Sequence, residues 1–190
     1  MTDELLMLVN DRHPITKSYH PDLIRVEGEY QTTVDKRVVK DLKQMLRDCR
    51  KAGCSPLVCS SYRSLEKQTN LFNEKVRQYR VYSGLSESEA KKEAAVWVAY
   101  PGTSEHHTGL AVDIVDIHYQ LLDEKQESTS TQQWLLKNCQ KYGFILRYPV
   151  DKKAITHIQY EPWHYRYVGK ENAQKIYESG LCLEEYLNKK

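Results

Sequence analysis

The central segment of this sequence reads Ser104-Glu105-His106-His107-Thr108-Gly109-Leu110-Ala111-Val112-Asp113. The apolar run in its second half predicts a central strand over residues 109–117, and the polar residues before that run predict a loop over 104–108. Because side chains alternate between the two faces of a strand, Ala111 and Asp113 should share one face and their apolar neighbours should pack on the other. A lone buried carboxylate in such a strand costs several kcal/mol, so the pattern favours a paired or metal-bound Asp113.

A second segment, Glu161-Pro162-Trp163-His164, carries another imidazole with a carboxylate three residues before it. His106, Asp113 and His164 together supply two imidazoles and one carboxylate. This is the three-ligand set of a catalytic zinc ion, which keeps its fourth position open for water or substrate. Structural zinc sites usually have four protein ligands, often thiolates, and no cysteine stands near either segment. The two segments therefore predict one catalytic zinc ion with Glu161 as the general base.

Composition indicates one domain over residues 1–190, because this length suits a single sizeable core. With 28 Lys and Arg against 26 Asp and Glu, the net charge of +2 gives no case for binding nucleic acid or an anionic membrane. The first residues carry acids where a secretory signal is basic, and their apolar run is too short to span a membrane. Five cysteines without a Cys-x-x-Cys pair fit a reducing compartment. We expect a cytosolic protein, or alternatively an extracytoplasmic domain whose anchor has been removed.

The remaining elements follow from hydrophobic periodicity and from caps. Residues 1–33 are expected to form a loop-rich lead-in with a short strand or helix near 5–9, and residues 170–190 to form C-terminal helices. We expect helices over 34–53, 65–79, 86–99, 131–142 and 171–178, and strands over 56–63, 144–149 and 155–168. The caps assigned to them are Thr33 and Gly53 for the first helix, Ser86 with Glu89 for the third, and Ser130 and Gly143 for the fourth.

Helices mixed irregularly with short strands indicate an α+β fold, in which a small, mostly antiparallel sheet has helices packed to one side. Arg63 follows the end of a strand, a position from which side chains often enter a cleft. Trp163 stands between the expected base and a ligand, so we expect it to form a wall of the substrate pocket. The polar stretch 121–131 is either a rim of that pocket or a solvated connection.

The pattern Ser104-x-His106-x-x-Gly109-x-Ala111-x-Asp113 followed by Glu161-x-x-His164 resembles the zinc D,D-peptidases that trim D-alanyl-D-alanine, a family that includes vancomycin-resistance carboxypeptidases and dipeptidases. The resemblance covers roughly residues 9–168 and is strongest to the bifunctional dipeptidase/carboxypeptidase type. Further positions of this chain that match the family in order and surroundings are Tyr62-Arg63, Gln68, Tyr142-Gly143-Phe144 and Arg147-Tyr148-Pro149.

This resemblance implies a hedgehog/D,D-peptidase-like fold and an activity in remodelling cell-wall precursors. It implies zinc on His106, Asp113 and His164, with Glu161 as the base. It also implies Arg63 as the group that stabilises the oxyanion. Ser104 and Gln68 would orient the substrate, and the partners would be peptides or peptidoglycan precursors that end in D-Ala-D-Ala.

Two other classes stay open. An L,D-carboxypeptidase, or an endolysin that cuts L-alanyl-D-glutamate, would use the same ligands and base on a different bond, because specificity depends on pocket shape. A non-enzymatic zinc-stabilised binding domain is a further alternative. The presence of both Glu161 and Arg63 disfavours this last class, since a purely structural site needs neither. The preferred peptide length and the oligomeric state are not indicated by any residue.

Overall fold

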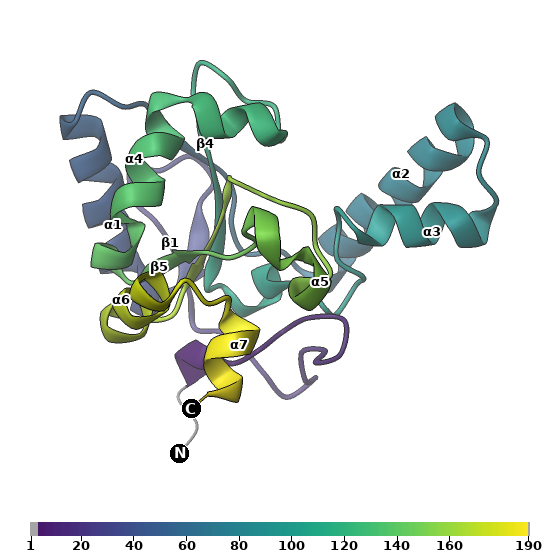
Figure 1. Ribbon diagram of the computed structural model, residues 1–190, viewed down its shortest axis with the longest axis horizontal. Coiled ribbons are helices and arrows are strands. Elements are labelled where there is room, and N and C mark those ends of the chain that lie inside the picture. Colours follow the sequence, from purple (N-terminus) through teal and green to yellow (C-terminus); the bar gives the residue numbers. More distant parts are fainter. Residues whose placement is uncertain (1–3, 190) are drawn as a thin grey trace.

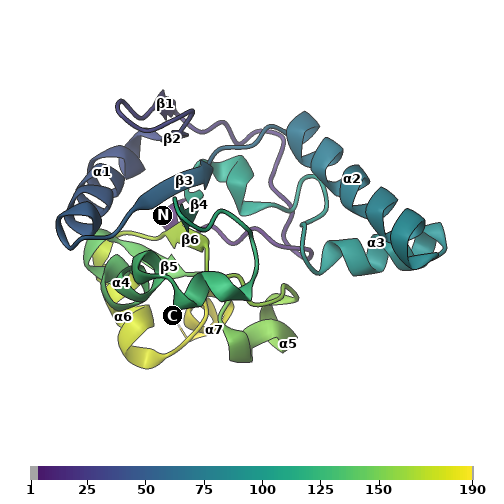
Figure 2. The same cartoon turned by 90° about the horizontal axis from the view of Figure 1, so that it is seen from above.

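The computed structural model describes residues 4–189, and it is organised around a four-stranded antiparallel sheet. The strands are β3 (Pro56–Ser60), β4 (Ala111–Asp116), β5 (Phe144–Leu146) and β6 (His164–Tyr167), in the order β3-β4-β6-β5 (Figure 2). In the pairing of β4 with β6, Asp113 lies directly opposite His164. Residues paired in this way point to the same face of a sheet, so this register brings two distant segments of the chain to one point.

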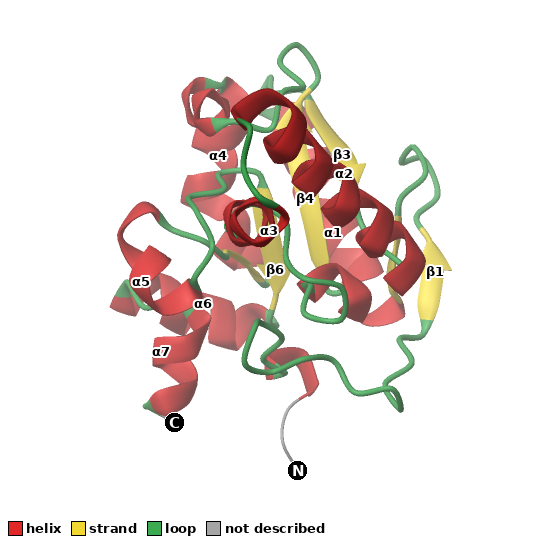
Figure 3. Ribbon diagram, turned by 90° about the vertical axis from the view of Figure 1, so that its right-hand side faces the viewer, coloured by secondary structure: helices red, strands yellow, loops and turns green. Residues whose placement is uncertain are grey.

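Helices α1 (Lys36–Lys51) and α4 (Ser130–Asn138) pack on the other face of the sheet (Figure 3). The side chains of α1 that are fully buried recur at helical spacing. They are Val38, Leu42, Met45, Leu46 and Cys49. Each large aliphatic side chain of this kind contributes about 1.5–3 kcal/mol by burial. They meet Val112, Ile114 and Tyr165 from the strands, which leaves the opposite face free for polar groups. The expected α+β class, with a small antiparallel sheet and helices over one face, is confirmed.

Two further helices form a hairpin that projects away from the sheet (Figure 2). These are α2 (Leu65–Ser83) and α3 (Glu87–Ala95), which bury a small apolar cluster between them. Ser86 and Glu89 form the expected capping box at the start of α3. Over residues 4–189, no helix combines the length and the apolar character that crossing a membrane requires.

The first and last described helices lie close to one another and to the β5 edge of the sheet (Figure 1). A cluster that includes Leu6, Ile145 and Leu183 joins the two ends to β5. The N-terminal elements are the 3-10 helix Glu4–Leu6 and a two-stranded antiparallel sheet of β1 (Leu23–Arg25) and β2 (Thr33–Asp35). The C-terminal elements are α5 (Lys153–Thr156), α6 (Lys170–Ser179) and α7 (Leu183–Asn188). Residues 1–3 of the expected lead-in and Lys190 lie outside the described residues.

Two helix starts differ from the sequence-based expectation. Helix α1 is capped by Asp35, whose side chain accepts a hydrogen bond from the backbone of Arg37, and not by Thr33. The reason is that Thr33 pairs with β1 as part of β2. Helix α4 is capped by Thr129, one residue before the expected Ser130. In both cases the helix begins where a side-chain oxygen reaches an unsatisfied backbone N–H group.

The expected strand over 155–168 is also wrong in its first half. Residues 153–156 form α5, and the chain then runs without regular structure until His164 begins β6. His157 has a positive φ of 60°, and Pro162 has no N–H group with which to pair. The aromatic composition of this stretch suits a strand, but these two residues interrupt the ladder. In place of one long strand, this part of the chain therefore forms the short helix α5, a loop and the short strand β6.

Gly109 connects the 3-10 helix Glu105–Thr108 to β4 with a φ of +70°, and a Cβ atom there would lie 2.8 Å from the backbone nitrogen of Asp35. Gly109→Ala should therefore lower the free energy of unfolding by about 3 kcal/mol, through the left-handed conformation and the overlap together. The control is Gly84→Ala, because Gly84 has a φ of +65° but no atom within 4 Å, and it should cost only about 1 kcal/mol. Urea unfolding measures both, and equal losses would contradict the close approach.

Candidate metal centre and active site

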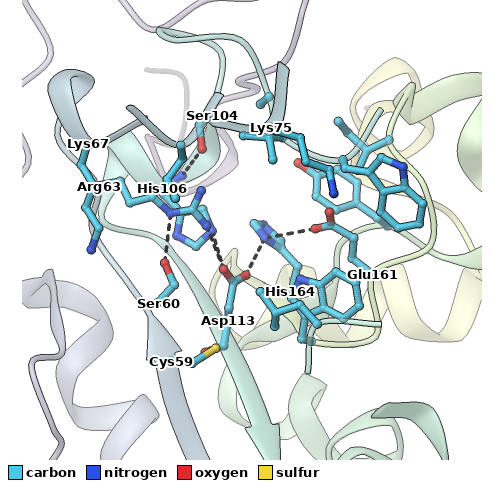
Figure 4. A pocket seen from close by; sticks show the side chains of 18 of the residues that line it. Cys59, Ser60, Arg63, Lys67, Lys75, Ser104, His106, Asp113, Glu161 and His164 are labelled. Carbon is cyan, nitrogen blue, oxygen red and sulfur yellow. Dashed lines mark hydrogen bonds and ion pairs between the residues drawn. The ribbon is translucent and has the colours of Figure 1, made fainter. Parts of the chain in front are cut away.

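Three side chains from the two sequence motifs meet on the open face of the sheet (Figure 4). His106, Asp113 and His164 each offer one ligand atom, and these atoms all lie within 4.8 Å of one another. Asp113 is central: its Oδ2 lies 3.2 Å from His106 Nε2, and its Oδ1 lies 3.0 Å from His164 Nδ1. All three side chains are buried. The fold therefore brings together the residues that the sequence predicts as ligands.

The donor set fits a zinc ion. His106 Nδ1 lies 2.7 Å from the backbone oxygen of Ser61, which leaves Nε2 turned toward Asp113. That Nε2 is buried and has no hydrogen-bond partner in the described part of the chain. Buried polar atoms are nearly always paired, so an unpaired imidazole nitrogen beside a carboxylate indicates a missing partner. Two imidazole nitrogens and one carboxylate oxygen are ligands that zinc accepts in an open catalytic site.

The two histidines differ in their affinity for protons. Burial, and then the charge of Arg63, lower the pKa of His106 to about 4, so this ring is neutral and ready to bind a metal. Burial also opposes a charge on His164, but Asp113 and Glu105 outweigh it and raise the pKa of that ring to about 9. In the metal-free protein His164 is therefore protonated at neutral pH, and it must release a proton from Nδ1 to bind a metal.

Local hydrogen bonds fix the backbone of the segment that carries His106. Ser104 caps the 3-10 helix Glu105–Thr108, because its hydroxyl accepts a hydrogen bond from the backbone of His106. Thr108 donates its hydroxyl to the backbone oxygen of Glu105 at 2.6 Å, which closes the turn. This segment is thus a compact helical turn, where the sequence predicts a loop. The turn fixes the direction in which His106 leaves the backbone.

A cavity of about 400 Å³ opens beside the three ligands. Glu161 lies at its edge with Oε2 3.8 Å from His164 Nδ1, and burial raises the pKa of this carboxyl group to about 8. Ser104 and Trp163 also line the cavity, as the sequence predicts for residues that contact the substrate. A buried acid beside a metal centre and facing a cavity can exchange protons with a bound substrate.

Arg63 lines the same cavity and donates three hydrogen bonds. Its Nη2 reaches Asp113 Oδ2 at 2.8 Å, its Nη1 reaches Gln68 Oε1 at 3.0 Å, and its Nε reaches Ser60 Oγ at 3.0 Å. Gln68 is fully buried behind Arg63 and donates its amide to the backbone oxygen of Ala99. Gln68 thus helps to hold Arg63 in place, and the substrate contact that the family resemblance implies for Gln68 stays a prediction.

Some functional groups at this site were missed by sequence reasoning. One wall of the cavity is formed by Lys67, Leu71 and Lys75, which recur every four residues along α2. Their spacing is visible in the sequence, but only the fold shows that this side of α2 faces the metal centre. Glu105 is another omission: its side chain is fully buried and lies 3.5 Å from His164 Nε2. Its position directly before a ligand was the one signal available.

An open three-ligand metal centre with a spare buried acid at a cavity is typical of zinc-dependent hydrolases, and on this fold it indicates a zinc peptidase. Residues 31–170 match the family model described as VanY, D-alanyl-D-alanine carboxypeptidase. The chain belongs to this family, as the resemblance in its motifs implies.

Two curated relatives illustrate the range of the family. The chain is 45% identical over 185 residues to a D-alanyl-D-alanine carboxypeptidase of Enterococcus faecalis, which covers 96% of this chain and 65% of that protein. It is 32% identical over 187 residues to the bifunctional D-Ala-D-Ala dipeptidase and carboxypeptidase VanXYC of Enterococcus gallinarum, covering 95% and 92%. The chain thus spans a little under two thirds of the length of the first relative. Its identity to the carboxypeptidase exceeds its identity to the bifunctional enzyme.

Solved structures agree with this assignment. VanYB in complex with D-alanine-D-alanine has a TM-score of 0.87 at 44% identity, covering 96% of this chain and 97% of that one. A mutant of the D,D-pentapeptidase VanY from a VanB-type resistance cassette, solved with Zn(II), has a TM-score of 0.86 at 44% identity over 96% and 98%. The LD-carboxypeptidase LdcB has a TM-score of 0.84 at 38% identity over 98% and 86%. The expected zinc cofactor is supported by the zinc-bound neighbour and by the ligand set of this chain.

Proposed function

We propose that this protein is a zinc-dependent D,D-carboxypeptidase, which removes the last D-alanine from peptidoglycan precursors ending in D-Ala-D-Ala, and that it also splits the free dipeptide. The observation that carries this proposal is the meeting of His106, Asp113 and His164 beside a buried Glu161 at the wall of one cavity. A relative that is 45% identical is a carboxypeptidase of this kind, and VanYB binds the dipeptide.

The ligands in this proposal are His106 Nε2, an oxygen of Asp113 and His164 Nδ1. A bound zinc ion would polarise the scissile carbonyl group and lower the pKa of water. Glu161 is the group that moves the proton: it takes one from the attacking water and returns it to the departing amine. Burial raises the pKa of Glu161 to about 8, so the protonated intermediate state of this side chain is accessible near neutral pH. A zinc ion bound nearby would lower the pKa of Glu161 again, because a positive charge favours the ionised carboxylate that accepts the proton from water.

Arg63 suits the oxyanion role that the family resemblance implies. A guanidinium group has five N–H donors, and three of them are used by Asp113, Gln68 and Ser60. The remaining donors belong to a side chain that lines the cavity. Because its three partners fix the plane of the guanidinium before substrate arrives, Arg63 can meet the developing negative charge without reorganisation.

Arg63→Ala should lower kcat by about 100-fold or more while raising KM much less, since the lost contact forms mainly in the transition state. Arg63→Lys should recover only part of this loss, because an ammonium group lacks the planar fork. Steady-state D-alanine release gives both constants. Zinc content must be measured alongside, because Arg63 also binds Asp113. A raised KM with kcat unchanged would make Arg63 a plain binding residue.

The proposed function is tested by D-alanine release from three substrates with the zinc-loaded protein: the dipeptide D-Ala-D-Ala, a pentapeptide that ends in it, and a tetrapeptide that ends in an L,D bond. Release from the first two supports the proposal. Release from the pentapeptide alone removes the dipeptidase part of it. Release from the tetrapeptide alone would replace it with L,D-carboxypeptidase activity, which LdcB represents among the structural neighbours.

Release from none of the three would favour the endolysin class or a zinc-stabilised binding domain. The binding-domain class is disfavoured by the buried Glu161 and by Arg63, both of which face the cavity. The cytosolic location expected from the sequence stays a prediction. It can be checked by following the protein in fractionated cells.

A further inference from the structure

Next to His164 lies a buried cluster of four charged side chains, which are not among the residues that line the cavity and which the proposed mechanism does not use. They are Glu105, Arg147, Arg166 and Glu184. The first three are completely inaccessible, and Glu184 is nearly so. Two carboxylates balance two guanidinium groups, so the cluster is neutral as a whole. Removing four charges from water carries a large desolvation cost even when they are paired, so stability alone does not explain this cluster.

The two oxygens of Glu105 have different surroundings. Its Oε1 accepts hydrogen bonds from Arg147 Nε at 2.8 Å and from Arg166 Nη1 at 2.7 Å. Its Oε2 has no hydrogen-bond partner among the described residues, and it faces His164 Nε2 across 3.5 Å. His164 Nε2 is itself one of only four buried side-chain atoms without a hydrogen-bond partner in residues 4–189. Two of these four atoms therefore lie 3.5 Å apart and face each other.

We propose that Glu105 is a positioning residue for the metal centre: its Oε2 holds the proton on His164 Nε2 and thereby turns Nδ1 toward Asp113 as a free ligand atom. This inference rests on the metal site proposed above. Which nitrogen of a neutral imidazole carries the proton is decided by the hydrogen bond that the other ring nitrogen makes. Partners of this kind commonly change metal affinity by 10- to 100-fold when they are altered.

The cluster also ties this orientation to the two ends of the chain. Arg147 reaches from Glu105 to Glu184 on α7, with distances of 2.9 Å and 2.6 Å to the two carboxylate oxygens. Arg166 donates to the backbone oxygens of Leu5 and Met7. The carboxylate that faces His164 is thus held by two guanidinium groups, which are themselves fixed by the first and last elements. The packing of the N-terminal segment and of α7 against the sheet therefore helps to fix the orientation of His164.

A single isosteric change tests the inference. In Glu105→Gln, Arg147 and Arg166 both need an acceptor, so the amide oxygen must take the place of Oε1. The amide NH₂ group then takes the place of Oε2 and donates to His164 Nε2. This donation moves the ring proton to Nδ1, the atom that the metal needs. The variant keeps the hydrogen bonds from Arg147 and Arg166. It reverses the contact with His164, because residue 105 now donates a hydrogen bond to Nε2 where Glu105 would accept one.

The matched control is Glu184→Gln, which removes the same charge from the same cluster but does not touch His164. Zinc affinity is measured by competition with a chelator, on protein shown to be folded by circular dichroism. We expect Glu105→Gln to weaken zinc binding by 10- to 100-fold and Glu184→Gln to change it by less than about threefold. Equal affinity in Glu105→Gln and wild type, or equal weakening in both variants, would overturn the inference.

A second measurement does not depend on whether the variants fold. Nitrogen-15 NMR of the zinc-loaded wild-type protein should show His164 protonated at Nε2, with slow exchange of that proton with solvent. Protonation at Nδ1 would overturn the proposal. Failure of the metal site itself has a different signature, because wild-type protein would then bind no zinc. Failure of the proposed enzymatic function alone would leave zinc binding and its dependence on Glu105 intact while no peptide is cut.

Discussion

Glu161→Gln should keep its zinc and lose about three orders of magnitude in kcat. The amide has the size of the carboxyl group but can neither take a proton from water nor return one to the departing amine, and general acid–base catalysis commonly contributes 10²- to 10⁴-fold. Glu161 is buried at the edge of the cavity, 3.8 Å from His164 Nδ1, so it lies beside the metal site where the water would be activated. D-alanine release from a D-Ala-D-Ala peptide gives the rate, and elemental analysis gives the zinc content.

Glu93→Gln on the exposed side of α3 serves as the control for handling and charge, and it should behave as the wild type does. If Glu161→Gln keeps near-normal turnover, Glu161 is not the base and another group must carry the proton. If it instead loses its zinc, the fall in rate says nothing about proton transfer, and Glu161 belongs with the metal ligands.

The ligands of the proposed centre could be predicted from the sequence because each motif is local. The apolar run around Asp113 marks a buried strand, and a carboxylate on that strand needs a partner. What the sequence could not show is the register that sets Asp113 opposite His164, because strand pairing joins segments about fifty residues apart. The expectation that the two motifs meet rested on their chemistry and on the family resemblance.

The errors have physical causes of the same kind. The stretch 155–163 has the composition of a strand, but tertiary context places α5 and a loop there. The contacts of the buried Gln68 amide with Arg63 and with the backbone of Ala99 could likewise not be read from the sequence. Glu105 could not be recognised because its partners come from residues far along the chain. Buried polar networks depend on long-range packing, which periodicity and motif spacing do not report.

Asp113→Ala should abolish zinc binding and hydrolysis together, since Asp113 is the residue that the other groups of the centre share. Its two oxygens lie within 3.2 Å of Arg63, His106 and His164. Without this carboxylate, zinc would keep two of its three protein ligands. Arg63 and His164 would also lose the carboxylate with which they pair. Removing one partner of a buried ion pair commonly costs about 3–5 kcal/mol, so the metal-free variant should also unfold at lower urea concentration.

Zinc should raise the melting temperature of the wild-type protein and leave that of Asp113→Ala unchanged. A ligand that binds only the folded state stabilises it by RT ln(1 + [L]/Kd), about 2.7 kcal/mol at 100 times Kd. Asp113→Asn separates the two effects: its amide oxygen can still accept from Arg63, so part of the stability returns, but a neutral amide is a poor zinc ligand. Full zinc occupancy in Asp113→Ala would refute the ligand assignment. Recovery of tight zinc binding in Asp113→Asn would show that shape matters there more than charge.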